Sequence, residues 1–200
     1  MFRPIQAYCT TLTQQFDRIS APRQSLLMAL SDYIAAQQTS NLLFICTHNS
    51  RRSHFGQIWA AVAAHFFGLN AVHTFSGGTE TTCFHHNAIA SLTAIGFDIT
   101  ATTQTSNPLY NVKFGEAQHM TCFSKRYDDE VNPHKDFAAI MTCSQAEQDC
   151  PVIFGADKRF SIGYDDPKAF DQTPMAQEAY RARCEQIALE MLFVFAQQRS

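Results

Sequence analysis

The chain has 200 residues, enough for one α/β domain with a full hydrophobic core and little beyond it. Hydrophobic residues make up 46% of it and charged residues 16%, a balance that excludes a disordered chain. The net charge of −3 gives no broad basic field, and no apolar run reaches the ~18 residues of a transmembrane helix. Neither nucleic acid nor a membrane is therefore an expected partner.

Residues 1–40 are predicted to form a helical N-terminal extension. Apolar residues recur every three or four positions from Ile5 to Ile19, and Ser20 and Pro22 mark the start of a second helix. We expect this extension to serve packing or dimerisation, with the homodimer formed through these helices. No basic segment followed by an apolar one opens the chain, so a secretory signal is not expected.

Residues 41–200 are predicted to be a single α/β domain. Short apolar runs typical of buried parallel strands alternate with longer amphipathic segments. We expect strands at 42–46, 72–75, 137–142 and 160–164, and helices at 53–66, 88–95 and 174–195. This alternation favours one open, mostly parallel four-stranded sheet flanked by helices.

Two further segments are harder to assign. Residues 100–136 show no clear period, which favours a lid or a binding loop, although a short helix is an alternative. The last helix is expected to begin with Thr173 as N-cap and Pro174 as its first residue. Cys184 falls on the apolar stripe of that helix and is predicted to lie in the core.

Seven cysteines are spread along the chain, and this odd number does not suit a disulfide-stapled secreted scaffold. We therefore expect a cytoplasmic protein whose thiols are reduced, most of them as packing residues. Cys83, His85 and His86 cluster ligand types but lack a matched second pair at zinc-like spacing, so no metal site is expected.

Cys46 lies where ligands bind in such sheets, at the carboxyl end of a predicted strand. It opens a C-x5-R-S segment that leads directly into a helix. The N–H groups of such a loop form an anion cradle, and Arg52 can grip two oxygens of a tetrahedral oxyanion. A cysteine in this positive environment is an activated nucleophile. The alternative is a buried cysteine in an ordinary βα turn. The predicted oxyanion-binding residues are Thr47, His48, Asn49, Ser50, Arg51, Arg52 and Ser53.

Asp166 is the candidate general acid, because a leaving oxygen must be protonated beside the anion site. It follows a predicted strand within Tyr164-Asp-Asp-Pro167, and Pro167 holds it in an extended backbone. Read alone, an Asp-Asp-Pro sequence is more often an ordinary turn. Its combination with Cys46 and Arg52 favours the catalytic interpretation.

These residues resemble the low-molecular-weight protein tyrosine phosphatase fold, over roughly residues 41–196. The resemblance implies that Cys46 is the nucleophile, Arg52 an oxyanion ligand and Asp166 the general acid. It also implies that Ser53 supports the thiolate and that Asn49 braces the loop.

A second motif is similar to the thioredoxin-coupled arsenate reductases that share this fold. Cys143 follows a predicted strand, and Cys150 comes seven residues later in front of a proline. The resemblance implies a relay in which arsenate is reduced to arsenite through Cys46, Cys143 and Cys150. Thioredoxin would be the external reductant, and no bound cofactor is expected. The alternative for Cys143 and Cys150 is a core cysteine and an unrelated loop cysteine.

Two departures from the family pattern fall within the loop. His48 replaces a usual glycine, and Arg51 replaces a usual cysteine. The Arg51 side chain is expected to point to solvent, and the alternative is that it adds a second positive charge near the anion. Two alternatives to the reductase therefore stay open. One is a phosphotyrosine or aryl-phosphate phosphatase with a phosphocysteine intermediate. The other is an oxyanion-binding or redox-sensing protein without turnover.

Overall fold

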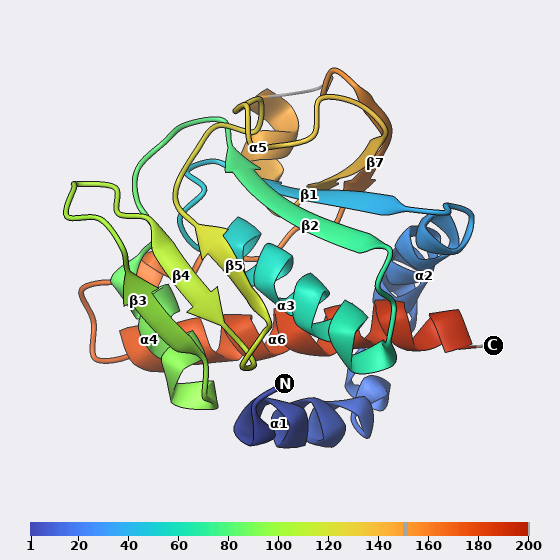
Figure 1. Cartoon of the computed structure of the whole chain (residues 1–200), viewed down its shortest axis with the longest axis horizontal. Coiled ribbons are helices and arrows are strands. Elements are labelled where there is room, and N and C mark those ends of the chain that lie inside the picture. The colour runs from blue at the N-terminus through green and yellow to red at the C-terminus, as the bar shows by residue number, and fades with distance from the viewer. Residues whose placement is uncertain (150–151, 200) are drawn as a thin grey trace.

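The computed structural model describes residues 1–149 and 152–199, and helices and strands alternate along them (Figure 1). The helices are α1 (Arg3–Thr13), α2 (Ala21–Ala35), α3 (Arg52–Phe67), α4 (His86–Ile95), α5 (Ser144–Asp149) and α6 (Ala176–Ala196). Short 3₁₀ helices are η1 (Phe16–Arg18), η2 (Pro167–Phe170) and η3 (Gln197–Arg199). The strands are β1 (Ser40–Cys46), β2 (Val72–Gly78), β3 (Asp98–Ala101), β4 (Tyr110–Lys113), β5 (His119–Cys122), β6 (Phe137–Met141) and β7 (Ala156–Ser161).

The main sheet has four strands in the order β2-β1-β6-β7, and every neighbouring pair is parallel. This confirms the predicted fold class. The fourth strand runs over Ala156–Ser161 and not over 160–164 as predicted. It is an edge strand in which Phe160 is buried and its neighbours are exposed or half-buried, so it lacks the apolar run that marks the inner strands.

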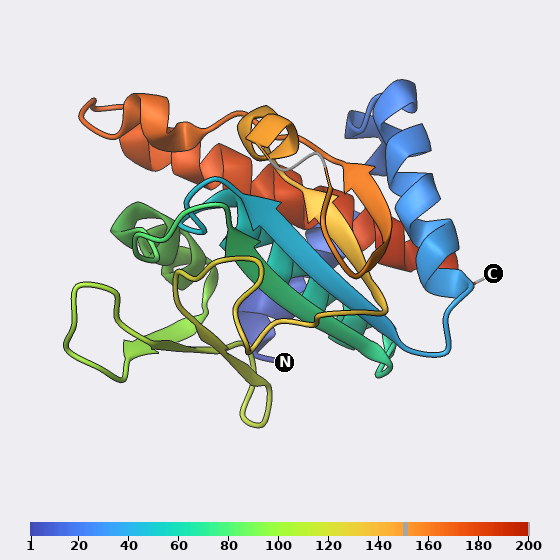
Figure 2. The ribbon, with the colours of Figure 1, turned by 90° about the horizontal axis from the view of Figure 1, so that it is seen from above.

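Helices cover both faces of this sheet, because successive side chains of the central strand β1 point to opposite sides. Leu42 and Phe44 pack with α3 and α6, whereas Leu43 and Ile45 belong to a smaller cluster with α5. Figures 1 and 2 show α3 and α6 on one side of the sheet and α5 on the other. Gly56 lets α3 approach closely, since a Cβ there would lie 2.4 Å from the Phe44 ring.

The N-terminal extension packs into the larger core of the same chain. Ile5, Cys9 and Leu12 of α1 and Leu27 and Leu30 of α2 are at most 2% exposed. Both helices contact α6 (Figure 1). The apolar faces that suggested packing or dimerisation are thus covered within one chain, and the homodimer stays a prediction.

Residues 98–122 form a small antiparallel sheet in the order β3-β4-β5. The predicted irregular stretch of residues 100–136 therefore contains strands β4 and β5, which were not predicted, whereas its residues 123–136 contain no helix or named strand. A role of this stretch as a lid or a binding loop stays a prediction. The strands of the small sheet have four residues each, and Val112 of β4 and Cys122 of β5 are their buried positions. One buried residue in so short a strand gives no visible alternation in the sequence.

The start of α6 also differs from the prediction, because the helix begins at Ala176. Thr173 forms a local turn instead, in which its hydroxyl accepts a hydrogen bond from Met175 N–H at 3.2 Å. The core position of Cys184 is confirmed, since it is fully buried and accepts a hydrogen bond from the Trp59 indole. Among the described residues, no helix combines the length and the apolar character needed to cross a lipid bilayer.

Candidate active site

Cys46 is the last residue of β1, and a tight loop connects it to the start of α3 at Arg52. The loop turns at Asn49, whose φ of 43° lies in the left-handed region that asparagine tolerates. Asn49 and Asp136 are the non-glycine residues with positive φ in the described part of the chain. His48 therefore has a backbone conformation that does not demand glycine.

The carbonyl groups of the loop are bonded to the surrounding chain. Cys46 and Thr47 accept from the backbone after β2, His48 from the Ser124 and Thr82 hydroxyls, and Ser50 from His85 N–H. The N–H groups from Thr47 to Ser53, by contrast, have no partner within residues 1–149 and 152–199. A loop of unpaired donors running into a helix start is suited to binding an anion.

A chain of hydrogen bonds connects Asn49 to the Cys46 sulfur. Asn49 accepts a hydrogen bond from Lys125 N–H at 2.9 Å and donates one to the Ser53 hydroxyl oxygen at 2.8 Å. That hydroxyl lies 3.1 Å from Cys46 Sγ. Because Ser53 Oγ already accepts from Asn49, its own hydrogen is free to point at the sulfur. A donor in this position stabilises a thiolate.

Arg52 and Asp166 form an ion pair at the same edge of the sheet. Arg52 Nη2 lies 2.6 Å from Asp166 Oδ2, and Nη1 donates to the Tyr164 carbonyl at 3.0 Å. Arg52 Nε is buried without a partner in the described part of the chain. The structure thus brings the predicted anion ligand and the predicted acid together, with one donor still unused.

Cys143 follows β6, the parallel neighbour of β1. The two strands are still hydrogen-bonded at their carboxyl ends, where Thr142 N–H donates to the Ile45 carbonyl at 2.7 Å. Cys143 Sγ lies 3.5 Å from Thr47 Oγ1 and belongs to the same apolar cluster as Cys46. Cys150, the third predicted redox residue, lies outside the described residues.

Comparisons with known proteins show which proteins the whole chain resembles. No family model matches the chain. Arsenate reductase 2 of Staphylococcus epidermidis is 25% identical over 151 residues, which cover 71% of this chain and 96% of that protein. An arsenate reductase of Brevibacillus brevis is 27% identical over 131 residues, covering 66% of this chain and 79% of the relative.

Solved structures show the same architecture. The YwlE mutant from Bacillus subtilis aligns with 81% of this chain and all of its own, at 16% identity and a TM-score of 0.55. A low-molecular-weight protein tyrosine phosphatase from T. tengcongensis aligns with 80% of this chain and 99% of its own, at 16% identity and a TM-score of 0.54. The chain has the fold of the low-molecular-weight protein tyrosine phosphatases. The similarity of fold inferred from its motifs is confirmed.

Arg51 was predicted to point to solvent, and this prediction was wrong. Its side chain is 9% exposed, with Nη2 lying 2.6 Å from Asp171 Oδ2. Its Nε donates a hydrogen bond to the Tyr180 hydroxyl. These partners lie 120 and 129 residues further along the chain, so no local pattern could indicate them.

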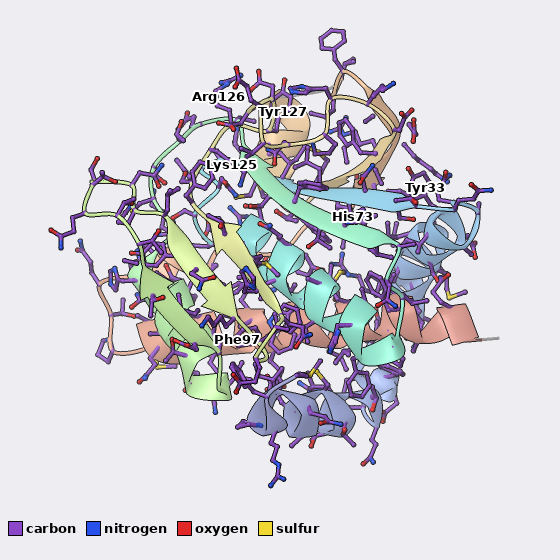
Figure 3. All side chains as sticks on the ribbon, in the orientation of Figure 1. Tyr33, His73, Phe97, Lys125, Arg126 and Tyr127 are labelled. Carbon is purple, nitrogen blue, oxygen red and sulfur yellow. The ribbon has the colours of Figure 1, made fainter. Side chains whose placement is uncertain are left out.

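Two buried basic side chains beside the oxyanion loop, Lys125 and His54, were not among the site residues predicted from the sequence. Lys125 is 4% exposed, and burial lowers its pKa. Figure 3 shows Lys125, Arg126 and Tyr127 beside the carboxyl end of β2. His54 of α3 is fully buried against Phe84. Burial, aided by the Lys125 charge, places the pKa of His54 well below its usual value.

Gly78 is the point where β2 meets the loop. A Cβ at Gly78 would lie 2.6 Å from the Thr47 carbonyl oxygen and 2.7 Å from Asn49 N, closer than packed atoms allow. We expect Gly78→Ala to lower the free energy of unfolding by about 2–3 kcal/mol, measured by urea denaturation. Gly163→Ala is the control, because no atom lies within 4 Å of its added Cβ. An equal effect of both substitutions would contradict the close approach.

Proposed function

We propose that this chain is a cysteine-dependent arsenate reductase that uses Cys46, Cys143 and Cys150 in sequence. The observation that carries the proposal is the 3.5 Å distance between Cys143 Sγ and Thr47 Oγ1, in the loop directly after the nucleophile. Thiol relays require a second sulfur next to the first. The two relatives named as arsenate reductases support the same substrate.

The first step is attack on the oxyanion. The loop N–H groups and the free Arg52 Nε bind arsenate, and Arg52 Nη2 turns from Asp166 toward an arsenate oxygen. The Cys46 thiolate attacks arsenic, and a sulfur–arsenic(V) bond forms. Asp166, released from the ion pair and protonated, gives its proton to the departing hydroxyl, which leaves as water.

The following steps transfer two electrons from thiols to arsenic. The Cys143 thiolate attacks Cys46 Sγ, the sulfur–arsenic bond breaks with its electron pair on arsenic, and arsenite leaves. This step makes a Cys46–Cys143 disulfide. Cys150 then attacks Cys143 Sγ, which releases the Cys46 thiolate and forms a Cys143–Cys150 disulfide. The dithiol of thioredoxin reduces that disulfide in a cytoplasm that keeps the remaining thiols reduced.

Cys143→Ser tests the relay. We expect NADPH consumption with arsenate, thioredoxin and thioredoxin reductase to fall at least ~100-fold, because serine cannot attack a sulfur to form a disulfide. Cys83→Ser serves as the control, since its half-buried side chain has no part in the relay. Unchanged turnover in the Cys143 variant would refute the relay.

A phosphatase is the second candidate, and Cys46, Arg52 and Asp166 are sufficient for it. The aligned phosphatase from T. tengcongensis supports this fold-level alternative. In that case the Cys143→Ser variant hydrolyses an aryl phosphate at the wild-type rate, and arsenate elicits no NADPH consumption from either protein. Anion binding without turnover of either substrate indicates the non-catalytic alternative.

A further inference from the structure

Arg51 stands directly before the predicted anion ligand Arg52, yet the two side chains have different partners. Arg52 faces Asp166, whereas Arg51 reaches Asp171 and Tyr180. The pairing of Arg52 with Asp166 must open when an oxyanion takes the Arg52 guanidinium. The pairing of Arg51 with Asp171 does not involve Arg52, so anion binding by Arg52 does not require this pair to open.

The Arg51 contacts form a closed triangle of three side chains. Its Nε donates to the Tyr180 hydroxyl, and its Nη2 lies 2.6 Å from Asp171 Oδ2. The Tyr180 hydroxyl in turn donates to Asp171 Oδ1 at 2.5 Å. Burial opposes ionisation of Asp171, but the Tyr180 hydrogen bond and the Arg51 charge outweigh it and lower its pKa. The pair therefore remains charged near neutral pH.

The triangle connects the oxyanion loop to the segment that carries Asp166. Asp171 follows η2 directly, and Asp171 N–H donates to the Lys168 carbonyl at 3.1 Å. Asp166 caps the other end of η2 by accepting a hydrogen bond from Lys168 N–H at 3.1 Å. One turn of 3₁₀ helix therefore lies between the carboxylate held by Arg51 and the candidate acid, so fixing Asp171 restrains Asp166.

His85 connects the same carboxylate to the loop by another route. Its backbone N–H donates to the Ser50 carbonyl at 3.0 Å, and its ring stacks on Tyr180. Burial and the Arg51 charge lower the pKa of His85 to about 4, so the ring is neutral at pH 7. Its Nδ1 accepts from Asn87 N–H, which places the ring proton on Nε2, 3.5 Å from Asp171 Oδ2.

We infer that Arg51 is a positioning residue that holds the Asp166 segment against the oxyanion loop through Tyr180 and Asp171. This inference rests on the proposed function only in that Asp166 acts as the acid. It assigns the two successive arginines different roles: Arg52 binds the anion, and Arg51 keeps the acid in place while Arg52 moves.

The test separates catalysis from anion binding. We expect Arg51→Ala to lower kcat about 10- to 100-fold, because a displaced acid transfers its proton poorly. The arsenate concentration that half-protects Cys46 from iodoacetamide is expected to change less than ~3-fold, since the loop donors and Arg52 remain. Arg51→Lys keeps the charge but cannot bridge both partners, so we expect little recovery. Arg181→Ala, an exposed neighbour on α6, is the control.

Three results would overturn the inference. If Arg51→Ala weakens the arsenate protection of Cys46 but leaves kcat unchanged, Arg51 is an anion ligand. If Arg51→Lys recovers the full kcat, the charge alone is sufficient. If Arg51→Ala changes neither kcat nor the protection, Arg51 has no role in the reaction. If Arg51→Ala does not fold, Tyr180→Phe is tested instead, because it keeps the ring and removes the hydroxyl that bridges Arg51 and Asp171. An unchanged kcat in the folded Tyr180→Phe variant would also overturn the inference.

A further measurement distinguishes failure of this inference from failure of the proposed function. If the wild type turns over neither arsenate nor aryl phosphate, the proposed function fails. Hydrogen–deuterium exchange of residues 164–173 still decides the inference, because it requires no reaction. Faster exchange in Arg51→Ala or Tyr180→Phe, but not in Arg181→Ala, supports the anchoring role, and unchanged exchange in a folded variant contradicts it.

Discussion

Cys46→Ser is expected to abolish arsenate-dependent NADPH consumption, with a loss of at least ~10⁴-fold. A serine hydroxyl beside the Ser53 hydroxyl has no base to deprotonate it and cannot form the disulfide that ends the first half of the relay. Oxyanion binding is expected to survive, because the unpaired loop N–H groups and Arg52 are unchanged. Isothermal titration with inorganic phosphate or arsenate measures that binding.

Cys122→Ser provides a control for the loss of a buried thiol. Cys122 ends β5 and is fully buried, and burial raises its pKa to about 12, so it stays a thiol at pH 7. We expect this variant to keep its turnover at temperatures where it is folded. Substantial turnover in Cys46→Ser would eliminate every mechanism that depends on this nucleophile.

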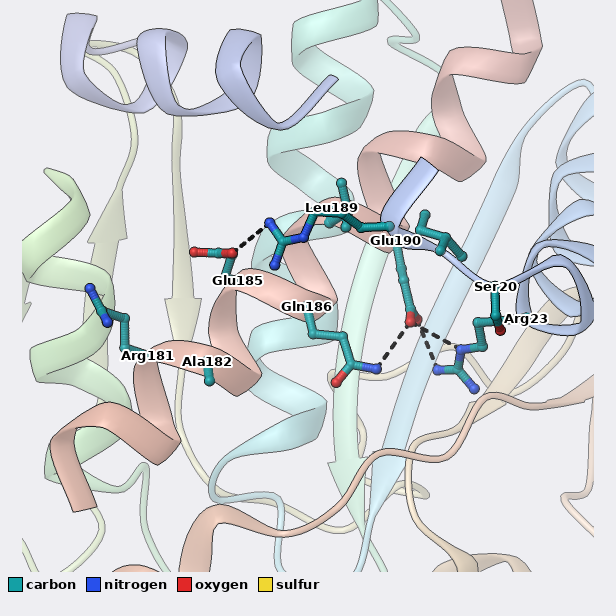
Figure 4. A pocket seen from close by; sticks show the side chains of 10 residues that line it. Ser20, Arg23, Arg181, Ala182, Glu185, Gln186, Leu189 and Glu190 are labelled. Carbon is teal, nitrogen blue, oxygen red and sulfur yellow. Dashed lines mark hydrogen bonds and ion pairs between the residues drawn. The ribbon is translucent and has the colours of Figure 1, made fainter. Parts of the chain in front are cut away.

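Arg23→Ala is expected to be the most destabilising of the proposed side-chain changes. Glu190 is 2% exposed, and Arg23 binds both of its carboxylate oxygens, at 3.1 and 2.8 Å. The Glu190 carboxylate also accepts hydrogen bonds from the Gln186 amide and the Tyr164 hydroxyl. Arg23, Gln186 and Glu190 line a cavity of about 420 Å³ (Figure 4). Removing Arg23 leaves a buried carboxylate without a counter-charge, so we expect the free energy of unfolding to fall by about 3–5 kcal/mol.

The exposed ion pair of Arg18 with Glu185 lies along the same cavity and is a matched control for the buried pair. Arg18 pairs with Glu185 at 2.8 Å, but those side chains are 49% and 32% exposed. We expect Arg18→Ala to cost at most ~1 kcal/mol, because water screens an exposed pair. The double variant Arg23→Met with Glu190→Gln removes both charges and is expected to recover at least half of the loss. Equal costs for the Arg18 and Arg23 variants in urea denaturation would contradict this account.

The inner sheet and the nucleophile loop could be predicted because their signals are local. Leu42–Ile45 and Phe137–Met141 are uninterrupted apolar runs, as strands buried on both faces require. In the C-x5-R-S sequence, the functional groups lie within one short loop, so their positions along the sequence determine where they lie in space. The pairing of β1 with β6 was not predicted, and the nearness of Cys143 to the loop was implied only by the relay that the family resemblance suggests.

The features that escaped prediction depend on distant parts of the chain. Arg51 looks like a solvent-exposed charge until Asp171 and Tyr180 are folded beside it. Lys125 is followed by the charged Arg126 and carries no sign of burial in its sequence. The small sheet of residues 98–122 is held by cross-strand bonds, and its exposed faces carry no apolar period.

The contacts of α1 and α2 with α6 have a consequence for the growing chain on the ribosome. Residues 36–175 separate the end of α2 from the start of α6, so the first two helices cannot contact α6 until these residues and α6 have been made. At ~5–20 residues per second, this interval lasts roughly 7–28 s. During that time the apolar residues Leu27 and Leu30 face water or a chaperone. Closure of the larger core therefore waits for the synthesis of α6.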